Sequence, residues 1–452
     1  MKVLVYGGGA RNHAICDKYG NSPNVSKVYF ANGNPGILFT TKGKRGLIEN
    51  VEFSDFNEVA EFCVENKVNL VDIGSETPLS AGLADIIHEK GIPTVGPLKK
   101  FCILESDRAF TDDMLKRIGV PKPEYKVFDN PEKAKHYARK IGYQVVVKAN
   151  GLAAGKGAIV CDDVQDAIDA IELIMEKKEF GDSGNRVVIE ERKYGTEISF
   201  FVFMDGKNAL PLRMFAQDYK RAFDDDDKEY LEIFGSNPNT GGTGSYCPHK
   251  LMSPWLINRI IKEIVNPTVN EIYSNLKWDY KGIMYFGLNI DPYDNLDVFE
   301  INVRWGDPEA QVLLRKLSSD LFEIGMAIWE GNLDKIELKW NNQHYVNIVA
   351  MEGRSKGSRS WYKGYPGRCG DKHLITGLDD VDPSVALFFG GVILDNNSRP
   401  LTLKGRVLNV IAGDKTLESA REKAYNNIKK ISFVDHKNSS KNCMRYRKTI
   451  GL

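Results

Sequence analysis

The sequence predicts an α/β protein made of several domains. Its 452 residues suffice for about three domains of roughly 150 residues each. A content of 42% hydrophobic and 27% charged residues is typical of a globular chain with several cores. Along the first hundred residues, short apolar runs alternate with helix-like patterns, which indicates βαβ units and a parallel sheet.

The first unit is expected to end near residue 100. Its strand-like runs lie at 2–6, 25–31, 46–51, 68–74 and 92–96, with helix-like stretches at 57–66 and 79–90. The first strand runs into "GGGARNHAI", a glycine turn that opens a helix. Consecutive glycines at a helix start let backbone N–H groups approach an anion, so we expect phosphate binding there. The spacing is not G-x-G-x-x-G and no acid ends the second strand, which disfavours a dinucleotide-dependent oxidoreductase.

The second unit is compact and resembles a lid. After a helix-like stretch at 105–117, two prolines in 118–128 mark a linker. The elements that follow are a helix at 131–141, strands at 143–148 and 157–161, a helix at 163–177 and a strand at 186–191.

The remaining chain alternates strands and helices. Strand-like runs are expected at 197–206, 209–215, 282–290, 296–303, 345–351, 390–394 and 406–413, and helices at 254–275 and 417–431. The turn "DPYDN" between the runs at 282–290 and 296–303 predicts a hairpin. The acidic run at 224–227 is expected to be a solvated loop, because four adjacent carboxylates repel one another.

Charge and cysteine usage exclude several classes of protein. The 61 basic and 61 acidic residues balance, so the chain as a whole has no excess positive charge to attract a polyanion. Nucleic-acid binding is therefore disfavoured. Seven scattered cysteines without a CxxC pair are typical of reduced thiols in a cytoplasmic protein. The apolar run that opens the sequence is too short for a signal segment. The sequence has no run of 18 apolar residues, so no membrane-spanning helix is predicted.

Two motifs predict a nucleotide site. In "KANGLAAGKG", Lys148 closes a strand and Lys156 lies in a loop of small residues that can fold over a triphosphate. Gly157 follows Lys156, so the Walker A order fails. In "VVIEERKYGTEIS", a strand end can present backbone groups to an adenine edge, and Glu197 can accept from ribose hydroxyls. The alternative for the first motif is a flexible hairpin with solvated lysines. The alternative for the second is a pair of surface glutamates without a binding role, which is common in proteins.

The stretch "DVFEINVRWGDPEAQ" predicts a metal site. Glu300 and Asn302 lie two apart on a strand and therefore share a face, as oxygen ligands for Mg²⁺. Arg304 is expected to continue that face, with Asp307 and Glu309 at the mouth of the site. The alternative is a half-buried strand with alternating apolar and polar residues, whose polar face is exposed to solvent and binds no metal.

These motifs together resemble the ATP-grasp superfamily and, within it, the phosphoribosylamine–glycine ligase family. The resemblance also rests on "QDYKR", "PNTGGTGSY", "GNPG", "GSETPLSAG", "ESDRAFTDDML" and the tail "GRVLNVIAG", all in family order along the whole chain. It implies a Rossmann-like N-terminal domain at 1–100 and a central ATP-grasp domain at 101–120 plus 192–330. It further implies an ATP-grasp lid at 121–191 and a small C-terminal α/β domain at 331–452.

The resemblance also implies roles for individual residues. Those near ATP are Arg108, Lys148, Gly155, Lys156, Glu190, Glu191, Lys193 and Glu197. Those near glycine are Asp218, Arg304 and Glu309, of which Asp218 and Arg304 are expected to be catalytic together with Lys148. Those on the phosphoribosylamine side are Gly8, Gly9, Asn34, Gly36 and Glu76, and the magnesium ligands are Glu300 and Asn302.

The implied reaction joins glycine to 5-phosphoribosylamine at the expense of ATP, through glycyl phosphate, in purine biosynthesis. Mg²⁺ or Mn²⁺ would serve as cofactor, and we expect a monomer or weak homodimer without nucleic-acid or membrane partners. Arg108 stands where the family usually has lysine, Tyr219 where it has histidine, and an acidic insertion spans 224–234. These departures keep two alternatives open, a related ligase with another amino acid or amine and a non-catalytic nucleotide-binding protein.

Overall fold

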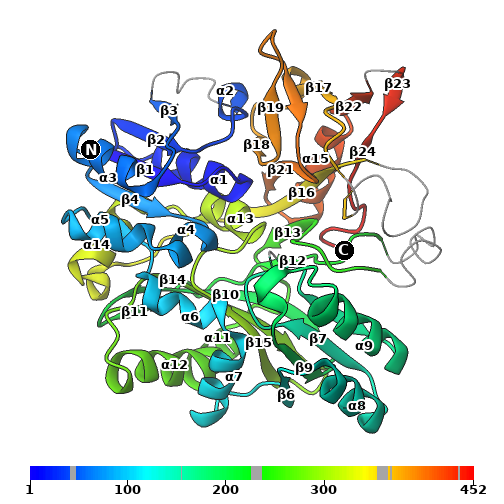
Figure 1. Cartoon of the computed structure of the whole chain (residues 1–452). Helices are drawn as coiled ribbons and strands as arrows, with labels where there is room; N and C mark the ends of the chain where they lie inside the picture. Colours follow the sequence, from blue (N-terminus) through cyan, green and yellow to red (C-terminus); the bar gives the residue numbers. More distant parts are fainter. Residues whose placement is uncertain (41–46, 154, 225–236, 354–364, 367–368, 436–437) are drawn as a thin grey trace.

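The computed structural model describes residues 1–40, 47–153, 155–224, 237–353, 365–366, 369–435 and 438–452. Figure 1 shows four groups of elements around a common centre, with both ends of the chain at the surface. The α/β prediction is confirmed. Among the described helices, none has the length and apolar character needed to cross a bilayer.

The N-terminal group is a parallel sheet in the order β3-β2-β1-β4-β5. Its strands are β1 (Lys2–Tyr6), β2 (Lys27–Ala31), β3 (Ile48–Val51), β4 (Leu70–Ile73) and β5 (Thr94–Val95). Its helices are α1 (Ala10–Tyr19), α2 (Ile37–Thr40), α3 (Phe56–Glu65), α4 (Glu76–Ala81) and α5 (Leu83–Glu89). Since the carboxyl ends of parallel strands meet at one edge, the glycine turn after β1 and the start of α4 after β4 lie at the same edge.

The lid group is an antiparallel sheet in the order β6-β9-β7-β8. Its strands are β6 (Tyr125–Phe128), β7 (Val145–Ala149), β8 (Ala158–Cys161) and β9 (Val187–Glu191). Helices α8 (Pro131–Ile141) and α9 (Val164–Ile171) cover it, and α9 continues as a π-helical turn, Glu172–Glu176. This order places β7, which carries Lys148, between β9 and β8.

The central group is built on an antiparallel sheet in the order β11-β10-β14-β15. Its strands are β10 (Thr196–Asp205), β11 (Ala209–Pro211), β14 (Lys281–Ile290) and β15 (Leu296–Asn302), and the hairpin predicted around "DPYDN" is confirmed. Its helices are α11 (Pro254–Ile260), α12 (Asn266–Asn270), α13 (Glu309–Lys316) and α14 (Leu321–Glu330), with π-helical turns at Ile261–Val265 and Glu271–Asn275.

The helix-like stretch expected at 105–117 is helical, with one interruption. The chain forms α6 (Ile103–Ser106) and α7 (Arg108–Arg117), separated by Asp107 in an extended conformation with φ −134°. The Asp107 side chain accepts from the Phe110 N–H and caps the start of α7. Arg108 therefore stands at the first position of a helix and faces the lid.

The C-terminal group contains two sheets, in the orders β12-β13-β16-β21-β18 and β19-β20-β17-β22-β23. The first comprises β12 (Gln217–Asp218), β13 (Gly244–Cys247), β16 (His344–Glu352), β18 (Ala386–Phe389) and β21 (Arg406–Asp414), with β24 (Met444–Arg445) also on β16 and α15 (Leu417–Ile428) packed against it. The second comprises β17 (Leu374–Thr376), β19 (Val392–Leu394), β20 (Pro400–Thr402), β22 (Ser432–Asp435) and β23 (Asn438–Asn442). Because β12 pairs with β13 and β13 pairs with β16, this sheet crosses the expected division at residue 330, and the four-part division itself stays a prediction.

The contact between the N-terminal and C-terminal groups leaves no room for a side chain at Gly36. A Cβ built on this buried glycine would lie 2.3 Å from Cβ and Cγ of Phe389, at the end of β18. We expect Gly36→Ala to overpack the contact, at about 1–3 kcal/mol, and to lower the melting temperature by a few degrees. Gly9→Ala is the matched control, since its Cβ would meet only Asn12 Oδ1, at 3.5 Å. A calorimetric scan that finds both variants melting like the parent chain would contradict this packing.

Candidate active site

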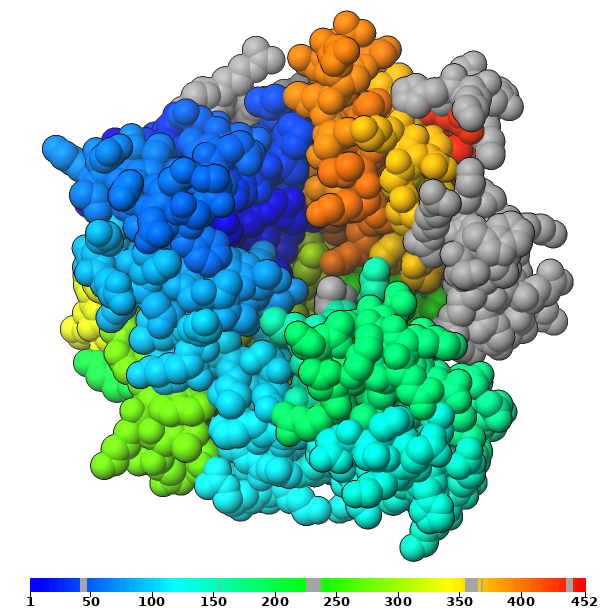
Figure 2. Space-filling model, viewed as in Figure 1, coloured from blue at the N-terminus to red at the C-terminus, as the bar shows by residue number. Residues whose placement is uncertain are grey.

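A cavity of about 350 Å³ lies where the lid and central groups meet loops of the N-terminal and C-terminal groups. Figure 2 shows a hollow between the blue, orange and green parts of the surface. Most of the predicted site residues line the cavity: Glu76, Arg108, Lys148, Gly155, Glu190, Glu191, Lys193, Glu197, Asp218, Glu300, Asn302, Arg304 and Glu309. The others, described below, do not line it: Gly8, Gly9, Asn34, Gly36 and Lys156.

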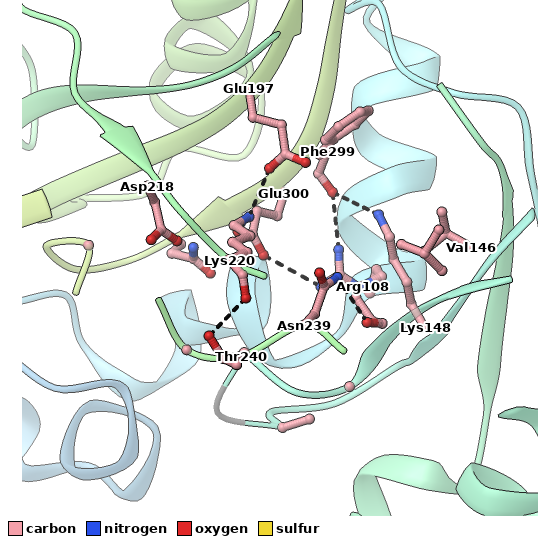
Figure 3. A pocket seen from close by; sticks show the side chains of 18 of the residues that line it. Arg108, Val146, Lys148, Glu197, Asp218, Lys220, Asn239, Thr240, Phe299 and Glu300 are labelled. Atoms are coloured by element: carbon pink, nitrogen blue, oxygen red, sulfur yellow. Dashed lines mark hydrogen bonds and ion pairs between the residues drawn. The ribbon is translucent and has the colours of Figure 1, made fainter. Parts of the chain in front are cut away.

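Two cations converge on one backbone carbonyl in the cavity. Lys148 on β7 donates to Phe299 O at 3.1 Å, and Arg108 Nη1 donates to the same oxygen at 3.2 Å (Figure 3). Lys148 is buried and also forms an ion pair with Glu190 on the neighbouring strand β9. Burial lowers the pKa of Lys148, and the carboxylate of Glu190 opposes that effect. One end of the cavity therefore holds two cationic groups, both positioned against β15 by the same carbonyl.

A second cluster centres on Glu300 of β15. Its carboxylate lies 3.1 Å from Lys220 Nζ and 3.9 Å from Arg108 Nη2, and Lys220 also lies 3.5 Å from Glu197. Burial would raise the pKa of Glu300, but these cations outweigh it and lower the pKa to about 2. The Glu300 carboxylate is therefore ionised at neutral pH.

Asn302 joins Glu300 on the cavity wall as expected. Its amide nitrogen lies 3.1 Å from Glu105 Oε1 when the amide is oriented to donate to it. Within the described ranges, no group of three or more His, Cys, Asp or Glu residues could hold a metal ion. One carboxylate and one amide oxygen nevertheless fit Mg²⁺, which takes one or two protein ligands and fills its octahedron with phosphate and water oxygens.

Arg304 lines the same cavity as Glu300 and Asn302, as expected. Strand β15 ends at Asn302, and beyond it Arg304 pairs with two acids, one on α4 and one on α6. Its Nε lies 3.3 Å from Glu76 and its Nη2 lies 2.9 Å from Glu105. Arg11 of α1 pairs with the same oxygen of Glu76, at 3.0 Å. Although burial opposes it, these guanidinium groups lower the pKa of Glu76.

Asp218 and Glu309 form a carboxyl pair deep in the cavity. Glu309, expected at the mouth, is instead buried, and its Oε1 accepts from Ser199 Oγ at 2.7 Å. Asp218 Oδ1 is a buried atom without a hydrogen-bond partner in the described part of the chain. Burial and the charge of Glu309 raise the pKa of Asp218, and burial likewise raises the pKa of Glu309. The pair therefore favours a proton or another cation between its members.

The cavity wall beside Lys148 suits a flat apolar group. Val146, Val160, Phe299 and the small residues of the loop line it, beside the end of β9 from Glu190 to Tyr194. Glu191 pairs with Lys193 at 2.9 Å, whereas the Glu190 side chain is occupied by Lys148. Lys148 occupies Glu190 Oε2, while Glu190 Oε1 has no hydrogen-bond partner among the described residues.

The glycine loop reaches across to the C-terminal group. A Cβ on Gly155, whose φ is +73°, would lie 3.3 Å from Gly241 Cα. The Lys156 ammonium is exposed and lies over the ring of Tyr365, 5.5 Å from its centroid. The two lysines of the motif thus lie apart, with Lys148 in the cavity and Lys156 on the outer side of the loop.

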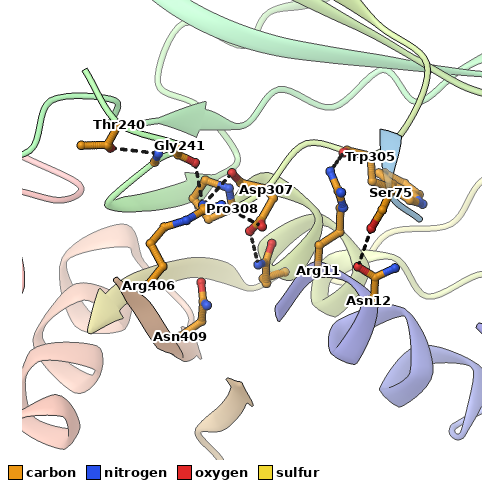
Figure 4. A network of polar contacts seen from close by, with 12 residues as sticks. Arg11, Asn12, Ser75, Thr240, Gly241, Trp305, Asp307, Pro308, Arg406 and Asn409 are labelled. Carbon is orange, nitrogen blue, oxygen red and sulfur yellow. Dashed lines mark hydrogen bonds and ion pairs between the residues drawn. The ribbon is translucent and has the colours of Figure 1, made fainter. Parts of the chain in front are cut away.

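The glycines after β1 lie at the contact between the N-terminal and C-terminal groups. Asn34 is buried, and its amide donates to Gly8 O at 3.0 Å and to Phe389 O at 2.7 Å. Gly9 is the N-cap of α1 and Gly36 packs on Phe389. This cluster connects to the cavity through Arg11, which donates to Trp305 O at 2.8 Å (Figure 4).

Sequence reasoning missed several residues that build the cavity. Lys220 stood in the quoted "QDYKR" without a role, and Glu105 stood in "ESDRAF". Arg406 is a third, because its guanidinium donates to Gly241 O at 2.6 Å and Asp307 O at 3.0 Å, and pairs with Asp307 Oδ2 at 3.1 Å (Figure 4). Only Lys220 had a local signal, since it lies two residues from Asp218 and so shares its face on an extended chain.

Comparison with known proteins places the whole chain. Family models of phosphoribosylglycinamide synthetase match in succession, with the N domain at residues 1–105, the ATP-grasp (A) domain at 106–310 and the C domain at 361–452. A phosphoribosylamine–glycine ligase of Archaeoglobus fulgidus is 40% identical over 481 aligned positions, covering 100% of this chain and 99% of that protein.

Two solved structures agree with this match. The crystal structure of a phosphoribosylamine–glycine ligase from Thermotoga maritima superposes with a TM-score of 0.75 at 26% identity, covering 99% of both chains. The biotin carboxylase domain of a Hydrogenobacter thermophilus 2-oxoglutarate carboxylase, in complex with MgADP, ADP and bicarbonate, superposes with a TM-score of 0.63 at 16% identity. It covers 95% of this chain and 90% of its own, and shares the fold alone. The chain therefore belongs to the phosphoribosylamine–glycine ligase family, the ATP-dependent carbon–nitrogen ligases of purine biosynthesis built on the ATP-grasp fold.

Proposed function

We propose that the cavity joins glycine to 5-phosphoribosylamine through glycyl phosphate, with release of ADP and phosphate. The observation that carries this proposal is the pairing of a cationic end, around Lys148 and Arg108, with the buried carboxyl pair Asp218 and Glu309. The first suits a triphosphate and the second suits the ammonium group of an amino acid.

ATP is assigned to the space between the lid and central sheets. Its base meets the apolar wall and the backbone of Glu190 to Lys193, and its ribose meets Glu197. Its phosphates meet Lys148 and Arg108, with Gly155 and Lys156 in the loop above. Arg108 stands where the family usually has lysine. Because the positive charge is kept, the planar guanidinium group of Arg108 contacts phosphate in place of the lysine ammonium group.

Glu300 and Asn302 would hold Mg²⁺ or Mn²⁺. The ion, when bound, neutralises phosphate charge and polarises the γ-phosphate. The chain's own contribution is to keep Glu300 ionised and in place, because Lys220 lies 3.1 Å from it. Lys220 is then close enough to neutralise charge that develops on the transferred phosphoryl group.

Glycine is assigned to the space between Arg304 and the Asp218–Glu309 pair. The guanidinium of Arg304 orients the carboxylate, and the acid pair receives the ammonium group. Phosphoribosylamine approaches from the N-terminal group, where Glu76, Gly8, Gly9, Asn34 and Gly36 form its expected site.

The chemistry then needs no covalent enzyme nucleophile. The glycine carboxylate attacks the γ-phosphorus and ADP leaves, which gives an acyl phosphate. The amine of phosphoribosylamine attacks the acyl carbon, loses a proton and expels phosphate, which forms the amide bond. Positioning and charge neutralisation supply the rate enhancement, and a closed glycine loop keeps water from the acyl phosphate. We also infer that the protein works in the cytoplasm, as a monomer or weak homodimer.

ADP release with Mg-ATP tests this function directly, with phosphoribosylamine generated in situ and glycine added or omitted. ADP that appears only with both substrates, together with glycinamide ribonucleotide by mass, is the expected result. Turnover with another amino acid or amine instead would favour the alternative ligase. ATP binding without turnover on any carboxylate would favour a non-catalytic role.

Glu300→Gln tests the metal assignment. The variant keeps the side-chain volume but loses the charge, so turnover should fall by at least about 100-fold, equivalent to ~2.7 kcal/mol of transition-state stabilisation. The Mg²⁺ concentration for half-maximal rate should also rise. Asp297→Asn on the same strand is the matched control and should keep parental turnover. Unchanged metal dependence in Glu300→Gln would remove Glu300 from the metal site.

Asp218→Asn tests recognition of the amino group. Burial and the charge of Glu309 raise the pKa of Asp218, so the pair takes up a proton more readily than a free carboxyl, and an arriving ammonium group should lower that pKa and favour proton release. Calorimetry of glycine binding at pH 7, in buffers of different ionisation enthalpy, should therefore detect proton release. The variant should lose this release and show a KM for glycine raised about tenfold or more, with nucleotide affinity unchanged as the internal control. Parental proton release in the variant would rule this assignment out.

A further inference from the structure

The segment that carries Asp218 and Lys220 has a second face, turned away from the cavity. We name residues 217–224 the pocket segment. Asp218 and Lys220 line the cavity, whereas the ring of Tyr219 between them packs toward Tyr246 of β13, at 6.3 Å between centroids. This alternation is that of an extended chain. Whatever holds Tyr219 therefore also fixes the direction of its two neighbours.

One side of the pocket segment is held by the loop before β13. Tyr219 N donates to Gly244 O at 2.9 Å, and Thr243 N and Thr240 N donate to the carbonyls of Tyr219 and Lys220, each at 2.8 Å. β12 is the edge strand of its sheet, so its other side needs a different partner.

The last residues of the chain supply that partner. We name residues 447–452 the tail; Figure 1 shows the C-terminus beside β12 and β13. Gly451 N donates to the Tyr219 hydroxyl at 3.0 Å, and the Arg447 guanidinium lies over the Tyr219 ring at 5.3 Å and donates to Arg221 O at 3.2 Å. Ile450 is fully buried in the C-terminal core, which anchors the tail.

Asp224 makes the strongest of these contacts. The acidic run was expected to be solvated, but Asp224, its one described member, is buried and faces the tail. Its carboxylate accepts from Lys448 N and Thr449 N at 3.0 Å and from Thr449 Oγ1 at 2.7 Å, and lies 3.6 Å from Arg447 Nε. A buried carboxylate is tolerated only when such donors are present. All of these donors come from the tail, so the observed path of the pocket segment depends on it.

We propose that the tail is a positioning element of the active site, which holds Asp218 and Lys220 in place through Tyr219 and Asp224. The roles of Asp218 and Lys220 rest on the proposed function. Displacement of catalytic groups by about 1 Å can cost about 100-fold in rate, so this contact has a functional consequence beyond stability. It also accounts for Tyr219 and Asp224 without a change of substrate, because both face the tail.

Tyr219→Phe, compared with Tyr446→Phe, separates positioning from packing. Both changes remove one phenol hydroxyl, but Tyr446 precedes the tail and its ring packs near Tyr425 of α15, at 6.2 Å. Tyr219→Phe should raise the KM for glycine about fivefold, as expected for one lost hydrogen bond. Nucleotide affinity and melting temperature should stay near the parental values. Tyr446→Phe should match the parent in all three measurements.

Hydrogen exchange in Asp224→Asn provides a readout independent of ligase activity. The loss of charge should speed amide exchange at Tyr219, Thr240 and Thr243 as well as at Lys448 and Thr449, and raise the KM for glycine by about 10–100-fold. Faster exchange at Lys448 and Thr449 alone, with unchanged KM in both variants, would overturn the proposal. If the parent chain lacked ligase activity, the proposed function would fail, and the exchange pattern would still decide whether the tail orders the pocket segment.

Discussion

Charge neutralisation inside a closed cavity is the constraint on which the rest of the structure depends. A buried ammonium, guanidinium or carboxylate is costly unless an opposite charge or several dipoles face it. Lys148 is therefore paired with Glu190, Glu300 with Lys220 and Arg108, and Arg304 with Glu76 and Glu105. Each pair joins residues that are far apart in sequence. The pairs of Glu300 with Lys220 and of Arg304 with Glu76 also link different groups of elements, so charges that suit a triphosphate and an amino acid contribute to holding these groups together.

The Asp218–Glu309 pair is the exception to this balance. Lys220 and Arg406 are near enough to lower the pKa of Asp218, yet burial and the second carboxyl dominate and raise it. Asp218 Oδ1 lacks a hydrogen-bond partner among the described residues, as do Glu190 Oε1 and Arg304 Nε, but Glu190 and Arg304 form ion pairs through their other atoms. A site that is balanced everywhere except at one acid pair favours a cationic group at that point. This physical asymmetry supports an amino acid as the second substrate independently of family membership.

Local periodicity explains which parts of the site were predictable from the sequence. Glu300 and Asn302 share a face because they lie two apart on a strand, and Lys148 ends a strand, so each could be assigned from its own neighbours. The ion pairs of Arg304 could not be predicted in this way, because its partners Glu76 and Glu105 lie on α4 and α6, far away in the sequence. Burial of Glu309 depends on Ser199, 110 residues earlier. The fold class followed from apolar patterns, whereas the pairing of β13 with β16 could not be read from such patterns.

The tail shows why residues outside a cavity can appear as departures from a family pattern. Tyr219 and the acidic run lie beside predicted substrate residues in sequence, which makes a changed substrate the natural first interpretation. In an extended segment, however, neighbours point in opposite directions, and Tyr219 contacts Gly451 rather than the cavity. A substitution there acts on the orientation of Asp218 and Lys220, not on the shape of the binding space. In a strand, a residue next to a catalytic residue therefore points away from the substrate, and a change there affects how the catalytic residue is held. Residues two positions from it face the substrate, and changes at those positions bear on substrate choice.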